Sequence, residues 1–203
     1  MSSLLAPSGP SLLDYAGAAL TQAGEELLWA RADDEVIARV AAALRIRKQA
    51  DAVLLAAIGE VEARDLATTR GASSTRAWLT GAHQVDPAEA GMLVRTARAL
   101  RAGFEKTGAA IAAGDVSLAQ ARVVIRSVQD LPKEMGPELS AAAERLMVGH
   151  CASFDPPTLA LIGRRLAEVV DPEGTQAHDE QKLLDLMSRS SSIWRTRPTT
   201  SAD

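Results

Sequence analysis

Apolar residues recur at helical spacing along most of the chain. From residue 36 to residue 61 aliphatic side chains recur at helical spacing, and no proline occurs between residue 33 and Pro87. Asp33 is a suitable N-cap for such a helix, and the acidic residues after it complement the helix dipole. Gly71 is a typical terminator. The pattern predicts one long helix from about 34 to 69.

Capping signals predict shorter helices on both sides of the long one. Asp86, Pro87 and Glu89 begin one helix, and Ser117 with Gln120 forms a capping box that begins another. One predicted short helix carries residues 77–79. The other predicted helices cover residues 12–30, 87–101, 105–113, 117–131, 134–150, 155–171 and 175–188. The predicted fold class is therefore all-α, a multi-helix bundle with one long helix. Residues 1–10 are expected to be a disordered lead-in, 11–187 the helical domain and 188–203 a disordered tail.

Composition agrees with a helical core. Alanine and leucine dominate, whereas aromatic residues, which favour sheets, make up only 3% of the chain. Trp29 and Trp78 are expected to be core anchors. The single cysteine, Cys151, excludes an intramolecular disulfide and fits a reducing compartment. Without a targeting segment or an apolar run of membrane-spanning length, the protein is expected to be cytoplasmic and to have no membrane partner.

Charge is distributed unevenly along the chain. Residues 1–63 carry nine acidic and five basic side chains, residues 64–126 carry five and nine, and residues 127–203 carry twelve and eight. A basic middle between acidic ends is compatible with a polyanion-binding surface, because arginine neutralises phosphates. Ordinary solvated helix faces are the alternative interpretation.

Two segments have the pattern of a helix-turn-helix. The first joins the helix around Trp78 to 87–101, and the second joins 105–113 to 117–131. In such a unit the first residues of the second helix meet the base edges of DNA. Gln can pair with adenine and Arg with guanine, and the second unit has such residues early in its second helix. The second unit is therefore the better candidate for base contacts, whereas the arginines of the first unit suit contact with the DNA backbone. The candidate DNA-contacting residues are Arg95, Arg98, Arg101, Gln120, Arg122 and Arg126. Packing alone also accounts for both units.

No reaction chemistry is recognisable in the sequence. The three histidines, His83, His150 and His178, are not at metal-ligand spacing, and His150 next to Cys151 is interpreted as a helix-end pair. Neighbouring carboxylates are interpreted as caps or solvated faces. Nucleotide-binding loops and nucleophile elbows are also lacking. We therefore expect a protein that is not an enzyme and has no metal, cofactor or small-molecule ligand.

Several motifs in a fixed order give a family resemblance. They include GASSTRAWL at 71–79 and AAGDVSLAQARVV at 112–124, together with segments 54–67, 85–100, 155–160 and 170–174. Over about residues 30–187 the chain resembles domain-of-unknown-function family 222 (DUF222), the 13E12 repeat proteins of mycobacteria and other actinobacteria. Beyond Met187 the resemblance is expected to end.

The resemblance bears on function only through the domain arrangement of the family members. Members of this family usually carry the helical domain ahead of an HNH nuclease domain, whose motifs are not found in this sequence. One hypothesis is a helical, DNA-associated accessory module without nuclease activity of its own, truncated before the nuclease. A second is a protein-interaction or dimerisation module that self-associates through the long helix, by Val40 and Leu44 or by Ile58 and Val61. A third is a decayed fragment of a mobile repeat element.

Overall fold

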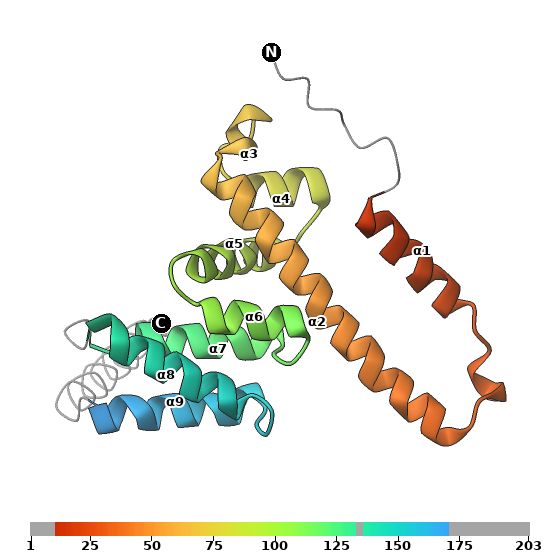
Figure 1. Cartoon of the computed structure of the whole chain (residues 1–203). Helices are drawn as coiled ribbons and strands as arrows, with labels where there is room; N and C mark the ends of the chain where they lie inside the picture. Colours follow the sequence, from red (N-terminus) through yellow and green to blue (C-terminus); the bar gives the residue numbers. More distant parts are fainter. Residues whose placement is uncertain (1–10, 133–135, 171–203) are drawn as a thin grey trace, which may run out of the picture. The chain divides into compact units, whose positions relative to one another are not determined.

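The fold of the protein is all-α, as predicted (Figure 1). The computed structural model describes residues 11–132 and 136–170. In order, its helical elements are α1 (Leu12–Gly24), the 3₁₀ turn η1 (Leu28–Ala30), α2 (Asp33–Ala63), α3 (Leu66–Thr69), α4 (Thr75–His83), α5 (Pro87–Arg101), α6 (Glu105–Ala113), α7 (Leu118–Gln129), α8 (Gly136–His150) and α9 (Pro156–Val170). The predicted lead-in, the helix at 175–188 and the tail lie outside the described residues.

The chain divides into two units, residues 1–43 (unit 1) and residues 44–203 (unit 2), and the division falls inside α2. The predicted limits of one helical domain, 11 and 187, stay predictions. Among the described residues, no helix is both long enough and apolar enough to cross a bilayer.

The first predicted helix is six residues too long. It begins as expected, with Ser11 and Asp14 forming a reciprocal capping box, but α1 ends at Gly24. The chain then leaves the helical conformation and forms η1 before α2 begins at Asp33. Glycine weakens a helix interior because it gives up more conformational freedom than any other residue, and a Cβ at Gly24 would have no neighbouring atom within 4 Å.

The long helix is interrupted before its predicted end. α2 ends at Ala63, and Asp65 adopts a left-handed conformation with φ of 49°. Aspartate tolerates this conformation, and its Oδ1 accepts a hydrogen bond of 2.6 Å from the Thr68 hydroxyl. The break redirects the chain so that α3 packs against α4 and Ala67 is buried. Tertiary packing therefore overrides a helical pattern that is continuous in the sequence.

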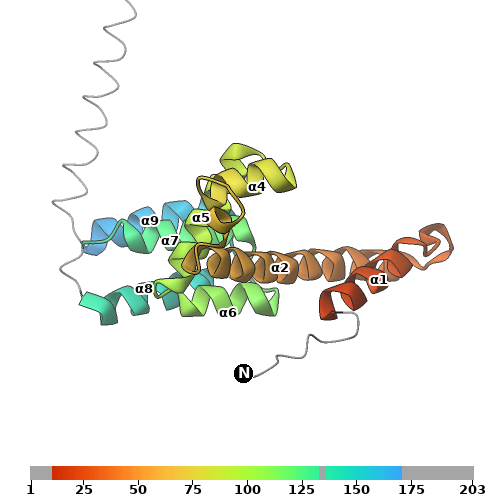
Figure 2. The same ribbon diagram turned by 90° about the horizontal axis from the view of Figure 1, so that it is seen from above.

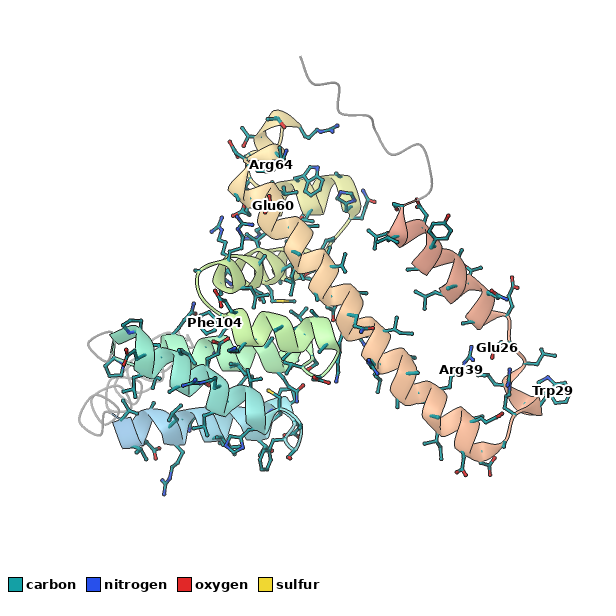
Figure 3. All side chains as sticks on the ribbon, viewed as in Figure 1. Glu26, Trp29, Arg39, Glu60, Arg64 and Phe104 are labelled. Atoms are coloured by element: carbon teal, nitrogen blue, oxygen red, sulfur yellow. The ribbon has the colours of Figure 1, made fainter. Side chains whose placement is uncertain are left out.

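The core lies in unit 2 and is built from small and aliphatic side chains. Its fully buried members come from most helices of the unit and from the turn before α7: Leu55, Ile58, Ala90, Ala97, Ile111, Val116, Ala121, Val124, Met147 and Leu159. α7 lies against α8 and α9 in both views (Figures 1 and 2). Trp78 is partly buried against this core, as expected for an anchor. Trp29 is not, because it is 84% exposed and points away from the ribbon (Figure 3).

Candidate functional site

Two of the three predicted α5 arginines form ion pairs within unit 2. Arg98 donates through Nε to Glu62 Oε2, and Arg101 Nη1 lies 2.5 Å from Glu60 Oε1. This hydrogen bond from Arg98 is the largest of the effects that lower the pKa of Glu62. Both glutamates lie near the end of α2, where Figure 3 labels Glu60. These arginines therefore tie α5 to α2, a role missed because the glutamates look like ordinary solvated residues.

Arg95, the third predicted arginine of α5, has a different environment. It is exposed, and its Nη1 lies over Gly91, as does the Nε of Arg76 from α4. Arg76 was not among the predicted site residues. Its proximity follows from the way α4 packs on α5, which the spacing along the sequence does not reveal.

The second predicted helix-turn-helix has the expected local structure. α6 ends at Gly114, whose φ of 83° lies in the left-handed region, and α7 follows after a capping box between Ser117 and Gln120. Short turns that contain glycine are typical of the motif. Helices 105–113 and 118–129 therefore match the prediction closely.

The Gln120 side chain, however, is fully engaged inside the domain. Its Oε1 accepts bonds of 3.0 Å from both the amide and the hydroxyl of Ser117. Its Nε2 donates to the carbonyl oxygens of Cys151 at 2.7 Å and Phe154 at 2.9 Å, in the connection between α8 and α9. This connection lies against the start of α7, the part that would have to enter a groove of DNA. The bonding favours a structural role for Gln120.

Arg122 and Arg126 are one turn apart and exposed on α7. Arg122 forms no ion pair within the described residues, and Arg126 has one weak pair, 3.5 Å between its Nε and Asp130 Oδ2. Both side chains are thus available to solvent, as expected of residues that contact a phosphate backbone.

Unit 1 presents an apolar surface of a kind that soluble helical proteins usually bury. No residue between 11 and 43 is buried. The large apolar side chains exposed there, which we call the N-terminal apolar surface, are Leu12, Leu13, Tyr15, Leu20, Leu27, Leu28, Trp29, Ile37 and Val40. α1 contributes four of them and carries a single charged residue, Asp14, which its own capping box occupies. A helix that is almost uncharged on every side is normally covered.

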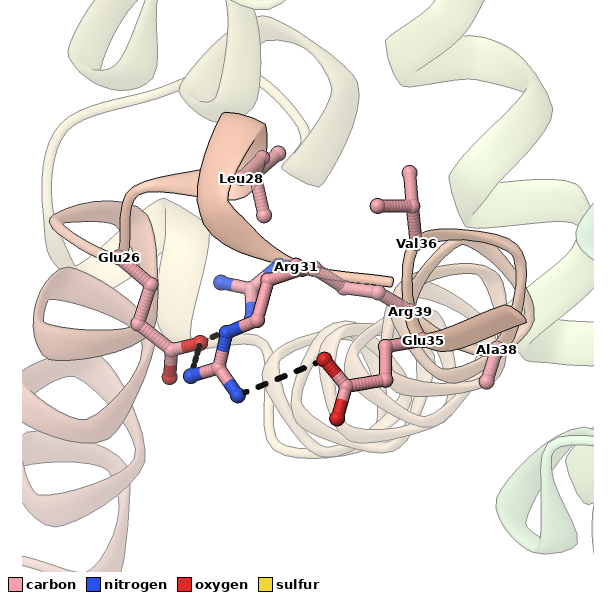
Figure 4. A pocket seen from close by; sticks show the side chains of 7 residues that line it. All are labelled: Glu26, Leu28, Arg31, Glu35, Val36, Ala38 and Arg39. Carbon is pink, nitrogen blue, oxygen red and sulfur yellow. Dashed lines mark hydrogen bonds and ion pairs between the residues drawn. The ribbon is translucent and has the colours of Figure 1, made fainter. Parts of the chain in front are cut away.

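A shallow pocket in unit 1 is lined by charged groups that neutralise one another (Figure 4). Glu26 Oε2 lies 3.1 Å from Arg31 Nη2 and 2.7 Å from Arg39 Nη1. Arg39 also donates to the Ala23 carbonyl at the end of α1, and Arg31 has a second, longer pair with Glu35. The pocket is therefore better explained as the joint between the α1–η1 segment and the start of α2 than as a ligand site.

The family comparison matches the model of "Domain of unknown function (DUF222)" over residues 34–195. That range is most of the chain. The chain belongs to the DUF222 family. The DUF222 match begins near the start of α2, so α1 and η1 precede it, and it continues past Met187, where we expected the resemblance to end. No curated protein and no solved structure matches the chain.

Within the DUF222 region, the adjacent His150 and Cys151 do not form a nucleophile pair. The Cys151 thiol is buried and donates to the Met147 carbonyl at 3.4 Å, and burial raises its pKa to about 11. The His150 ring instead packs against Phe154, with 5.7 Å between ring centroids. In the residues that the structure describes, no three His, Cys, Asp or Glu side chains are grouped as a metal site would require.

Proposed function

We propose that this DUF222 protein is a helical interaction module, without catalysis of its own, that self-associates through unit 1. The main observation that supports this proposal is the N-terminal apolar surface. It consists of nine large, exposed apolar side chains in a unit in which no described residue is buried. Helices of 12–15 residues are marginal in water without packing, and α1 has 13. A covering partner would therefore stabilise it.

The size of the surface fits a protein–protein interface. From the exposed fractions of these nine side chains, they present on the order of 700 Å² of apolar area. A standard specific interface buries roughly 800 Å² per partner. The summed apolar area of unit 1 is therefore comparable to one side of such an interface.

A second copy of the chain is the partner that this geometry favours. Each copy supplies two helical segments, α1 and the first third of α2, and two such pairs can bury their apolar sides in one four-helix bundle. Charge does not oppose this arrangement strongly, because Glu26 is neutralised by Arg31 and Arg39 and the other acidic residues lie mainly between residues 25 and 35.

Substitutions that keep the charge test the proposal. Leu13→Gln with Val40→Gln removes two apolar side chains from unit 1, and Leu161→Gln with Val169→Gln removes two similarly exposed ones from α9 as a matched control. By light scattering after gel filtration, the first double variant is expected to be monomeric and the control dimeric, like the unaltered chain. Equal dimerisation of the two variants would remove the proposal, and circular dichroism verifies that both are folded.

The second candidate function is association with nucleic acid, as an accessory module of an HNH-nuclease-type protein. The observation in its favour is the solvent-accessible pair Arg122 and Arg126 on α7. Binding of duplex DNA at low salt is expected to weaken when both become alanine, and to weaken further with added salt because condensed counterions are released. Affinity equal to that of the unaltered chain would exclude α7 as the contact.

A further inference from the structure

Two arginine side chains from neighbouring helices of unit 2 meet over a glycine. A Cβ placed on Gly91 of α5 would lie 3.3 Å from Nη1 of Arg95 and 3.5 Å from Nε of Arg76. The two nitrogens are therefore no farther apart than the sum of those distances. One guanidinium comes from α4 and the other from α5, so the packing of the two helices brings them together.

The two guanidinium groups lack a carboxylate partner in the described part of the chain. Arg98 and Arg101, farther along α5, each pair with a glutamate, but Arg76 and Arg95 do not. The Nε of Arg76 donates to the Pro87 carbonyl at 3.0 Å, which orients the side chain without neutralising it. Two adjacent positive charges without a counter-charge repel each other, and a bound anion would relieve that repulsion.

The glycine between them needs an explanation of its own. Gly91 is buried in the interior of α5, where glycine costs about 0.5–1 kcal/mol relative to alanine. The nearest atoms to a Cβ at this position all belong to the two arginine side chains. Glycine therefore leaves room for the Arg95 guanidinium, whose Nη1 alanine would displace by a few tenths of an ångström, whereas the Arg76 atoms would be in ordinary van der Waals contact with the added Cβ.

We propose that Arg76 and Arg95 form an oxyanion site whose ligand is a phosphate group. Guanidinium forks bind phosphate oxygens in pairs, and two forks can hold the oxygens of one group. The α5 N-terminus is not part of the site, since Asp86 Oδ1 already accepts from the amides of Ala88 and Glu89. The phosphate comes either from a nucleic-acid backbone or from free phosphate. The site does not depend on the proposed self-association.

The site is tested on the full chain with two probes, a fluorescein-labelled 20-base-pair duplex at low salt and inorganic phosphate. Loss of either arginine as Arg76→Ala or Arg95→Ala is expected to weaken binding about tenfold or more, because each removes a charge-assisted pair of bonds. The control is Arg64→Ala, which removes one exposed charge outside the site (Figure 3) and is expected to change affinity less than about twofold. Arg95→Lys keeps the charge but not the fork, and should restore only part of the affinity.

A further variant separates binding from folding. Gly91→Ala is expected to preserve or raise the melting temperature, since alanine favours helix, and still to weaken binding by displacing the Arg95 guanidinium. Binding of both probes with the same residue dependence supports a general phosphate site, and binding of the duplex alone supports the nucleic-acid backbone as the source. Binding of neither probe at low salt, or alanine variants that bind as well as Arg64→Ala, would overturn the assignment.

Discussion

The carboxylate of Glu144 on α8 caps the first turn of α6 through Thr107. Its Oε1 accepts hydrogen bonds of 2.8 Å from both the amide and the hydroxyl of Thr107, and both residues are buried. Thr107 is the third residue of α6, and the residue before the helix, Phe104, offers no side-chain bond. A residue distant in sequence thus satisfies donors that a local cap usually serves.

Removing this carboxylate should destabilise unit 2 strongly. Glu144→Ala leaves two buried donors of Thr107 without partners, and we expect a loss of about 3 kcal/mol in the free energy of unfolding. Glu144→Gln keeps an acceptor oxygen and should lose roughly half as much. Urea denaturation measures both. A stability of Glu144→Ala within about 0.5 kcal/mol of the unaltered chain would contradict the capping role.

The contact between α7 and α9 depends on Gly163. A Cβ at this position would overlap the Ser127 hydroxyl and lie 2.7 Å from its Cβ. Gly163→Ala is therefore expected to lower the free energy of unfolding by about 2 kcal/mol through overpacking. Gly149→Ala, at a helical glycine with open space around it, should instead be neutral or stabilising by up to about 1 kcal/mol.

A double-mutant cycle checks the cause. Ser127→Gly combined with Gly163→Ala removes the clash, so the loss in the pair should be smaller than the sum of the single losses by about 1 kcal/mol or more. Strict additivity would show that Ser127 is not the obstacle.

The bond from Arg98 to Glu62 should contribute to stability only while the carboxylate is ionised. Arg98→Ala is expected to cost less than about 1 kcal/mol at neutral pH, because Arg98 is largely exposed. The pKa of Glu62 is lowered from its ordinary 4.5 in the folded state, so the contribution is complete above pH 4.5 and disappears as pH falls through the folded value.

Urea titrations at several pH values compare the unaltered chain with Arg98→Ala. The stability difference should vanish at strongly acidic pH. Arg101→Ala breaks a pair in which both side chains are about half exposed and should have a smaller effect. A stability difference for Arg98→Ala that persists after protonation of the carboxylates would indicate packing rather than charge.

The thiol of Cys151 should be unreactive in the folded protein. Burial raises its pKa from an ordinary 9.0 to about 11, and a thiol reacts through its thiolate. Labelling with a disulfide reagent at pH 8 is expected to be at least about a hundredfold slower than in urea. The contribution of Cys151 to stability should be constant below pH 9 and fall as pH rises towards 11, because the unfolded thiol ionises first. Rapid labelling of the folded chain would disprove the burial.

Local signals predicted local structure well. The limits of 87–101 and 105–113, and the capping box of Ser117, were correct because glycine, proline and capping residues act on their neighbours. The break at Asp65 was missed, because the apolar pattern continues through it and the burial of Ala67 that accompanies it is a tertiary contact.

The candidate site was less predictable, because side-chain partners come from distant segments. Gln120 looks free in the sequence but is bound to the connection after α8, and Arg76 meets Arg95 only when α4 packs on α5. Trp29 was expected in a core on residue type alone, yet unit 1 has no buried residue in which to place it. Periodicity identifies an apolar side of a helix but not what covers it.

Sedimentation equilibrium of the unaltered chain tests self-association most directly. The experiment covers chain concentrations from about 1 μM to 1 mM. Dissociation constants in this range correspond to association free energies of roughly −8 to −4 kcal/mol. The account predicts a mass that rises from the 21.4 kDa of one chain to twice that value as concentration increases. A mass that stays at 21.4 kDa at the highest concentration would contradict it.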